Sequence, residues 1–204
     1  CARIVATSVA APGMMAIRSA ILAIPLAGFL GQAVRDEFER VLQQLSLLAE
    51  ACLETALAVT LQELEEKFGA VPNGRFAIVG MGKLGGRELD YNSDLDLVFI
   101  YDAAEDALSQ GGSQGSLTAH EFYVRLGQKF ITYLAAPTEE GVGYKIDMQL
   151  RPSGKSGPLV CSLDGFREYH STSSLLWERQ ALIKARFAAG DPALGKQIAQ
   201  ITEQ

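Results

Sequence analysis

The chain has 204 residues, of which 48% are hydrophobic, enough to bury the core of one ordinary domain or of two small ones. Its formal net charge of −6 argues against a protein that wraps nucleic acid over a broad basic surface. The three cysteines, Cys1, Cys52 and Cys161, lack metal-ligand spacing and lie far from both histidines in the sequence, so we expect reduced thiols and no zinc site.

The N-terminal segment is apolar enough to raise the question of a membrane or targeting sequence. The apolar run covers residues 19–34, which is too short to span a bilayer, and Pro25, Gly28 and Gly31 interrupt it. We interpret it as buried structure and expect a cytoplasmic protein with no membrane anchor. The first residue is Cys1 rather than Met, which indicates a processed chain or a piece of a longer one.

A helical pattern extends from about residue 14 to residue 69, with a break expected near residues 25–31. Apolar residues recur at steps of mostly three and four, as at Val41, Leu45 and Leu48. The pattern predicts an amphipathic helix or helical hairpin whose apolar stripe packs on the core, ending at a glycine before a turn into the first strand.

Residues 76–100 are the stretch around which the chain is organised, because they combine a buried strand, a glycine turn and two carboxylates. The unbroken apolar run at 76–79 predicts a strand covered on both faces. Glycines permit a positive φ or a close backbone approach, and the N–H groups of such a loop can converge on phosphate oxygens. The glycines of the turn are Gly80, Gly82, Gly85 and Gly86.

Asp94 and Asp96 open a second apolar run that ends at Ile100. Strand geometry places both carboxylates on one face, where they can share a divalent metal ion or a pair of ions. The alternative is that both are solvated residues closing the turn at Asn92 and Ser93. Because Asp is depleted in strands and a glycine turn precedes this pair, we favour a phosphate and Mg²⁺ site.

Gly80, Gly82 and Gly85 also spell the G-x-G-x-x-G fingerprint of dinucleotide-binding proteins. That fingerprint requires a helix of about ten or more residues before the next strand. Only residues 86–93 separate the last of these glycines from the acidic strand, so no crossover helix fits. A Walker phosphate loop is excluded as well, because Leu84 stands where Ser or Thr is required.

Residues 102–117 predict a long loop, of the kind that forms a lid, a binding loop or a mobile excursion. Thr118 and Glu121 then form a capping-box pattern that opens a helix of about eighteen residues ending near Pro137. His120 lies in the first turn of that helix, and we interpret it as a solvated residue rather than a catalytic one.

Residues 143–151 read as a third strand, with Asp147, Gln149 and Arg151 on one face. Asp147 and Arg151 form either a plain surface ion pair or a third metal ligand and a phosphate contact, and the residues leave this choice open. A turn-rich segment that contains Lys155 follows.

The remaining chain predicts three helices. Ser162 or Asp164 caps the first, the second extends from about residue 174 to residue 188, and Asp191 with Pro192 opens a last helix that continues to the end of the chain.

Four ordered motifs together resemble the glutamine synthetase adenylyltransferases. They are Gly-x-Gly-Lys-Leu-Gly-Gly-x-Glu-Leu at 80–89, Ser-Asp-Leu-Asp-Leu at 93–97, Asp-x-x-Leu-Arg-Pro-Ser-Gly at 147–154 and Trp-Glu-Arg-Gln-Ala-Leu at 177–182. The resemblance implies an α+β fold: a DNA polymerase beta-like nucleotidyltransferase domain with a small mixed sheet. It divides the chain into a helical segment (1–70), the nucleotidyltransferase core (71–160) and a helical C-terminal segment packed on the core (161–204).

The resemblance also implies a site and a reaction. Asp94, Asp96 and Asp147 would hold two Mg²⁺ ions, and a tyrosine hydroxyl of glutamine synthetase would attack the α-phosphorus of ATP to give AMP-tyrosine and pyrophosphate. Gly85 and Gly86 would present N–H groups to phosphate. The further candidates for nucleotide contacts are Ser93, Lys83, Arg87, Arg151 and Lys155.

Members of this family carry one domain that adds AMP and one that removes it by phosphorolysis to ADP. Residues 91–99 and the Arg-Pro-Ser-Gly ending resemble the adenylylating, C-terminal half. The resemblance implies regulation by the PII signalling protein in the full-length enzyme, and neither a nucleic-acid nor a membrane partner. A dinucleotide-binding oxidoreductase and a catalytically silent regulatory domain remain alternatives.

Overall fold

The computed structural model describes residues 32–138 and 141–203. The helix break expected near residues 25–31 lies outside these ranges. So does the apolar run at 19–34, except for residues 32–34, which begin the first described helix.

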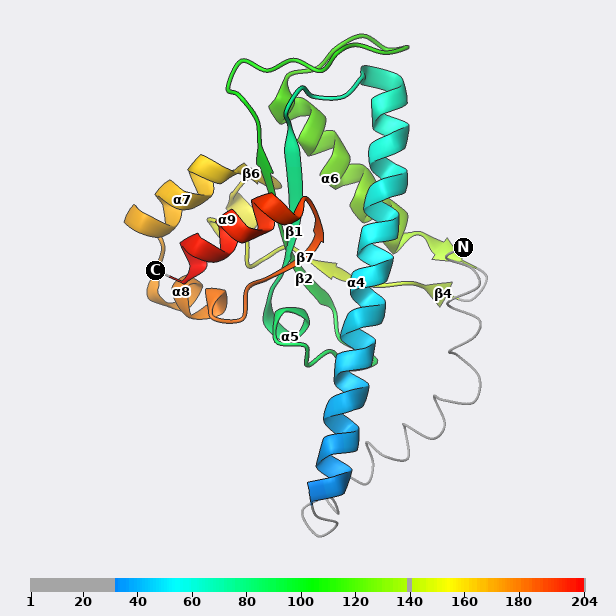
Figure 1. The fold of residues 1–204 in the computed structure, drawn as a ribbon, viewed down its shortest axis with the longest axis vertical. Helices are drawn as coiled ribbons and strands as arrows, with labels where there is room; N and C mark the ends of the chain where they lie inside the picture. Colours follow the sequence, from blue (N-terminus) through cyan, green and yellow to red (C-terminus); the bar gives the residue numbers. More distant parts are fainter. Residues whose placement is uncertain (1–31, 139–140, 204) are drawn as a thin grey trace.

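A five-stranded mixed sheet forms the centre of the molecule (Figure 1). Its path runs β5-β2-β1-β7, and β6 also pairs with β2. β1 is antiparallel to β2 and β7, whereas β2 is parallel to β5 and β6. The strands are β1 (Arg75–Gly80), β2 (Leu95–Asp102), β5 (Ile146–Asp147), β6 (Val160–Ser162) and β7 (Arg186–Gly190). The small mixed sheet expected from the sequence is therefore confirmed.

Helices cover both faces of the sheet (Figure 1). Phe76 and Ile78 of β1 join one apolar cluster with α4 and α6, and Ala77 and Val79 join a second cluster with α7, α8 and α9. The strand covered on both faces is thus confirmed. The helices are α4 (Gln32–Phe68), α6 (Ala119–Ala135), α7 (Leu163–Thr172), α8 (Leu176–Leu182) and α9 (Pro192–Thr202).

The remaining elements are short. α5 (Gly82–Gly85) is a single helical turn between β1 and β2, and η1 (Gly154–Ser156) is a 3₁₀ turn. β3 (Pro137–Thr138) and β4 (Gly141–Val142) form a separate two-stranded pair.

Helix α4 supplies a large part of the first cluster. Leu53, Leu57 and Leu64 are buried there, which confirms the predicted core-facing stripe. Within the described ranges α4 is also the one helix long and apolar enough to cross a membrane. Core helices of soluble proteins pass that test too, so it does not distinguish the two cases.

Three predicted helix starts, those of α6, α7 and α9, are confirmed. The Thr118 side chain accepts from the N–H of Glu121, whose side chain accepts in turn from the N–H of Thr118, as a capping box requires. Ser162, rather than Asp164, is the cap of α7. Asp191 accepts from the N–H of Leu194 at the start of α9, where Pro192 occupies the first turn.

Two predictions for the second half of the chain are wrong. The third strand is only Ile146–Asp147, because the chain turns after Asp147 and leaves β2. The helix expected to reach residue 188 ends at Leu182, and Arg186–Gly190 forms β7 against β1. Gly190 has φ +101°, and a Cβ there would overlap the Phe76 carbonyl, so glycine permits this close pairing.

The loop at 103–117 is held against the end of α4. Ser109 is buried and donates to the Phe68 carbonyl, while the N–H groups of Gln110 and Gly111 donate to the carbonyls of Ala70 and Phe68. These bonds satisfy backbone acceptors at and just beyond the helix C-terminus. The segment is therefore a cap on α4 rather than the lid or mobile excursion that its length predicts.

Candidate functional site

The turn between β1 and β2 lies directly on the head of β2. Gly80 pairs with Leu97, and the N–H of Met81 donates to the Asp96 carbonyl at 2.8 Å. The two strands are antiparallel and only α5 joins them, so there is no βαβ unit. The dinucleotide-binding alternative is excluded by this topology.

Two glycines of this turn, Gly82 and Gly85, are needed because neighbouring atoms lie too close for a Cβ. A left-handed backbone is not what they have in common. Only Gly82 among the four has a positive φ, of +51°, and a Cβ there would overlap Oδ2 of Asp96. A Cβ on Gly85 would overlap the Lys184 carbonyl just before β7. The sequence therefore places glycine where the turn touches Asp96 and where it touches β7.

The N–H groups of Gly85 and Gly86 are engaged inside the turn. They donate to the carbonyls of Met81 at 2.9 Å and Gly82 at 3.1 Å. In this conformation each of the two groups already has a backbone acceptor, and their role as phosphate donors stays a prediction.

Three aspartates gather at the head of β2. Asp96 lies beside Asp147 in the parallel register of β2 and β5, and Asp94 immediately precedes β2. Burial raises the pKa of Asp96, and the charges of Asp147 and Asp94 raise it further, whereas Lys83 opposes the shift. The other three side chains are therefore close enough to Asp96 to influence its charge.

The three aspartates offer the carboxylate oxygens that Mg²⁺ prefers as ligands. Their side chains are not, however, arranged in the geometry of a metal site. Within residues 32–138 and 141–203, no group of three His, Cys, Asp or Glu side chains has the arrangement of a metal site. The Asp147 carboxylate accepts from the backbone N–H of Gln149 at 2.7 Å and from its side chain at 2.9 Å. Each Asp147 oxygen accepts one hydrogen bond from Gln149 and keeps a further lone pair that an ion could use.

Lys83 and Ser93 are joined through Asp90. The ammonium of Lys83 lies 2.9 Å from Oδ2 of Asp90, and the Ser93 hydroxyl donates to Oδ1 at 2.6 Å. These two bonds, led by Ser93, lower the pKa of Asp90. Lys83 is thus held beside the carboxylates by a partner that sequence reasoning did not assign, although an Asp three residues before a Ser is a common turn pattern.

The other basic candidates differ in what they contact. Arg151 donates to the carbonyls of Met148 (2.7 Å), Lys155 (3.2 Å) and Gly157 (3.3 Å), so its guanidinium ties together the turn that follows β5. Lys155 is exposed in η1. Arg87 has φ +57° and lies 3.9 Å from Glu50 of α4. Of these three residues, Arg87 adjoins the glycine turn directly.

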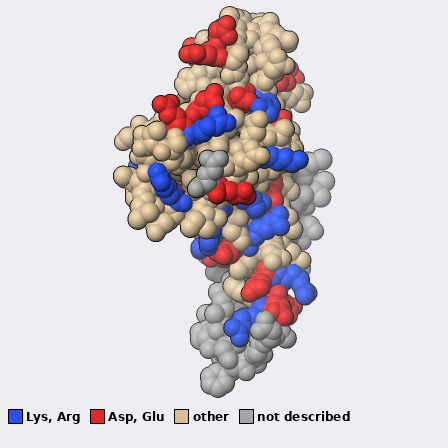
Figure 2. Space-filling model, turned by 60° about the vertical axis from the view of Figure 1, so that its left-hand side comes forward, with Lys and Arg blue, Asp and Glu red and all other residues tan. Residues whose placement is uncertain are grey.

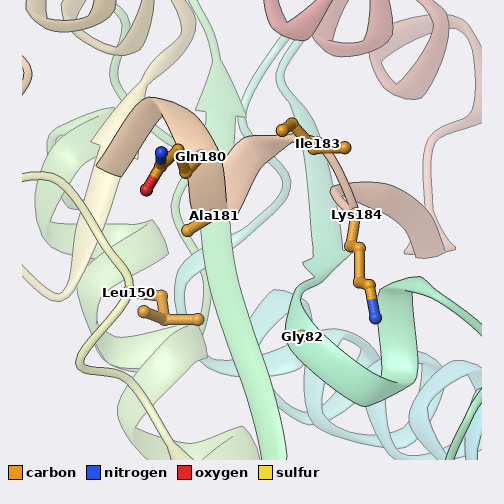
Figure 3. A pocket seen from close by; sticks show the side chains of 6 residues that line it. All are labelled: Gly82, Leu150, Gln180, Ala181, Ile183 and Lys184. Carbon is orange, nitrogen blue, oxygen red and sulfur yellow. The ribbon is translucent and has the colours of Figure 1, made fainter. Parts of the chain in front are cut away.

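An open cavity of about 250 Å³ lies beside α5 (Figure 3). Gly82 forms part of its wall, Ala181 points toward Leu150, and Lys184 extends toward α5. Gln180 and Ile183 complete the lining. Because Gly82 also touches Asp96, a ligand in the cavity would lie next to the carboxylates.

On the face drawn in Figure 2, Lys and Arg side chains are interspersed with Asp and Glu side chains, and they form no continuous basic surface.

Comparison with known proteins identifies the family. The family model for glutamate-ammonia ligase adenylyltransferase matches residues 18–201. The chain belongs to this family. The resemblance drawn from the four sequence motifs is therefore confirmed.

Several bacterial relatives are named bifunctional glutamine synthetase adenylyltransferase/adenylyl-removing enzyme. Those of Xanthomonas campestris pv. campestris (strain B100) and Burkholderia pseudomallei (strain K96243) are each 44% identical, over 79% and 76% of this chain. That of Mannheimia succiniciproducens is 40% identical over 76% of this chain. The matched regions cover 17%, 17% and 16% of these relatives, so this chain spans about a sixth of their length.

One contact with the glycine turn, made by Arg186, could not be identified from sequence. Arg186 of β7 donates to the carbonyls of Leu84 and Gly85 at 2.9 and 3.0 Å, and it pairs with Glu50. Its partners lie about a hundred or more residues earlier, and the segment around it was interpreted as helix. No local signal marks such a contact.

Proposed function

We propose that this chain contains one nucleotidyltransferase domain with a polymerase beta-like fold, which moves AMP from ATP to a tyrosine of glutamine synthetase. The observation that carries the proposal is the position of Asp96 beside Asp147, next to the glycine turn. Family membership supports the reaction class, and the relatives' printed names supply the protein substrate. We place the protein in the cytoplasm, with PII as a partner of the full-length enzyme.

In this proposal Asp94, Asp96 and Asp147 would hold two Mg²⁺ ions, whose charge would stabilise the triphosphate and lower the pKa of the attacking hydroxyl. The tyrosine oxygen bonds to the α-phosphorus, the bond to the bridging oxygen breaks and pyrophosphate leaves. Asp147 accepts the hydroxyl proton. Positioning and charge stabilisation supply most of the rate enhancement in such transfers.

Lys83 and Arg87 are our first candidates for triphosphate contacts, because the N–H groups of Gly85 and Gly86 already have acceptors. Ser93 acts through Asp90 and Lys83, while Arg151 and Lys155 remain more distant candidates. The apolar cavity beside Gly82 would take the adenine ring. Lys83 and Gly82 lie in the turn itself, and Arg87 lies two residues after it.

The proposed unit extends beyond residue 160. β6 and β7 belong to the same sheet as β1 and β2, so we propose that the nucleotidyltransferase unit includes residues through β7 as well as the core at 71–160. Helix α4 and the helices after residue 160 would then support one catalytic sheet.

The test is transfer of labelled AMP from ATP to purified glutamine synthetase in the presence of Mg²⁺. We expect transfer by the parent chain and its loss in Asp94→Asn, in Asp96→Asn and after chelation of the metal. Asp106→Asn is the control, since Asp106 is exposed in the loop at 103–117. Failure of the parent to bind Mg²⁺-ATP would contradict the proposal.

Deadenylylation is the second candidate, because the relatives' names include adenylyl-removing activity. Phosphate-dependent release of ADP from AMP-modified glutamine synthetase, without forward transfer, would assign this chain to that half. The same aspartate variants should abolish that release.

A further inference from the structure

The glycine turn is held from outside by two residues remote from it in sequence. Arg186 donates from Nε to the Gly85 carbonyl at 3.0 Å and from Nη2 to the Leu84 carbonyl at 2.9 Å. The same Nη2 pairs with Glu50 of α4. One guanidinium therefore connects α5, β7 and α4.

The contact is tight on the β7 side. Leu84 is fully buried, and Gly85 lies so close to the Lys184 carbonyl that a Cβ would not fit. A lysine at 186 would keep the charge but lose the fork that reaches two carbonyls and a carboxylate at once. The geometry therefore uses a property specific to arginine.

Helix α4 contacts this region through three residues spaced four apart. Ser46 accepts from the N–H of Leu89, Glu50 pairs with Arg186, and Glu54 accepts from the N–H of Gly190. Residues at this spacing share one helix face. One face of α4 thus bonds to the segment after α5 and to both ends of β7.

The held turn adjoins the aspartates. Gly82 abuts Oδ2 of Asp96, and the N–H of Met81 bonds to the Asp96 carbonyl. Lys83, in the same turn, contributes to the charge environment of Asp96. A displacement of α5 would change the positions of Gly82 and Lys83 relative to Asp96.

We infer that Arg186 and Glu50 are positioning residues, which hold α5 against the head of β2 and so set the geometry between Lys83 and Asp96. Their effect on nucleotide binding rests on the proposed function; their effect on the turn does not. Neither side chain itself needs to touch the nucleotide.

The test compares Arg186→Lys and Glu50→Gln with two matched controls. Arg75→Lys changes another strand arginine that pairs with a carboxylate, and the two arginine side chains are 27% and 29% exposed. Glu63→Gln changes another paired glutamate of α4, whose partner is Lys129 of α6. The readouts are the dissociation constant of Mg²⁺-ATP, hydrogen exchange of the amides at 82–86, and the thermal midpoint.

We expect about tenfold weaker Mg²⁺-ATP binding and about tenfold faster exchange in the turn for both test variants, because small misplacements near reacting groups have large effects. The controls should lower the thermal midpoint by a similar amount without either change. Unchanged exchange in the turn, or equal changes in the controls, would overturn the inference. If the parent does not bind Mg²⁺-ATP, the proposed function fails, while faster exchange confined to the test variants still supports the positioning role.

Discussion

Asp96 and Asp147 lie side by side on neighbouring parallel strands, although fifty residues of sequence separate them. Asp96 is partly buried and faces a second negative charge there, and its pKa is raised by both causes. Carboxylates in such a place oppose folding unless a cation neutralises them. The relationship links the stability of the fold to its proposed chemistry.

Asp96→Asn should stabilise the protein while it greatly slows AMP transfer. A raised carboxyl pKa means that the folded state binds the proton more tightly, so stability is lost as the pH rises through that pKa. Removing the charge should raise the free energy of unfolding at pH 7 by less than about 1 kcal/mol, because the group is partly solvated. Transfer should fall about a hundredfold to a thousandfold.

Denaturation in urea at pH 7, without added metal, measures this stability change. Asp106→Asn serves as the control and should change neither quantity. A loss of stability in Asp96→Asn would show that its carboxylate makes favourable contacts in the folded state, contrary to the prediction.

Gly82→Ala should destabilise the protein more than Gly115→Ala. Both glycines have a positive φ, +51° and +89°, which costs a non-glycine residue about 1–2 kcal/mol. A Cβ at 82 would also overlap Asp96, whereas a Cβ at 115 meets no atom within 4 Å. The difference between the losses of unfolding free energy in the two variants measures the effect of the contact with Asp96. Equal losses would contradict this prediction.

Ser46→Ala should cost about 1–3 kcal/mol, since it removes the acceptor of a buried backbone donor. Ser46 is 0% exposed and accepts from the N–H of Leu89 at 3.3 Å. The matched change is Thr55→Ala on the same helix, where the exposed hydroxyl bonds only to Ala51 of its own helix. Chemical denaturation of the two variants measures the difference, and a similar small cost for both would argue against anchoring by Ser46.

His170 should make the protein less stable in mild acid. Burial lowers the pKa of His170, and among the described residues neither ring nitrogen has a hydrogen-bond partner. The unfolded chain takes up the proton near pH 6.5 and the folded chain only at lower pH, so the free energy of unfolding falls as the pH drops below about 6.5. Phe166 packs edge-on against the ring, 4.4 Å between centroids, which helps to keep it neutral.

His170→Leu should remove this part of the pH dependence. Thermal unfolding between about pH 7 and about pH 5 measures it, and His120→Leu, at the exposed histidine of α6, should behave like the parent. Parallel curves for the parent and His170→Leu would refute the prediction.

Short sequence patterns correctly predicted most of the helices and strands that are marked by a capping residue or an apolar run of their own. The capping box at Thr118 and Glu121, the Asp191 cap before Pro192 and the buried run of β1 each act within a few residues, and each is confirmed. The wrong predictions concern segments whose structure depends on pairing with a strand that is distant in sequence. Arg186–Gly190 forms β7 only because it pairs with β1. Residues 148–151 leave the sheet because the chain turns after Asp147, where the N–H of Gln149 donates to the Asp147 carboxylate.

The sequence by itself determined the glycine turn, the Asp-x-Asp pair, the helix caps and the family, since each is written in residues that lie close together along the chain. Only the tertiary structure decided that Asp147 adjoins Asp96, that the N–H groups of Gly85 and Gly86 are engaged, and that Arg186 and Glu50 hold the turn. These facts depend on how strands pair and how α4 packs. Such contacts join residues far apart in sequence, and their geometry exists only once the core has formed.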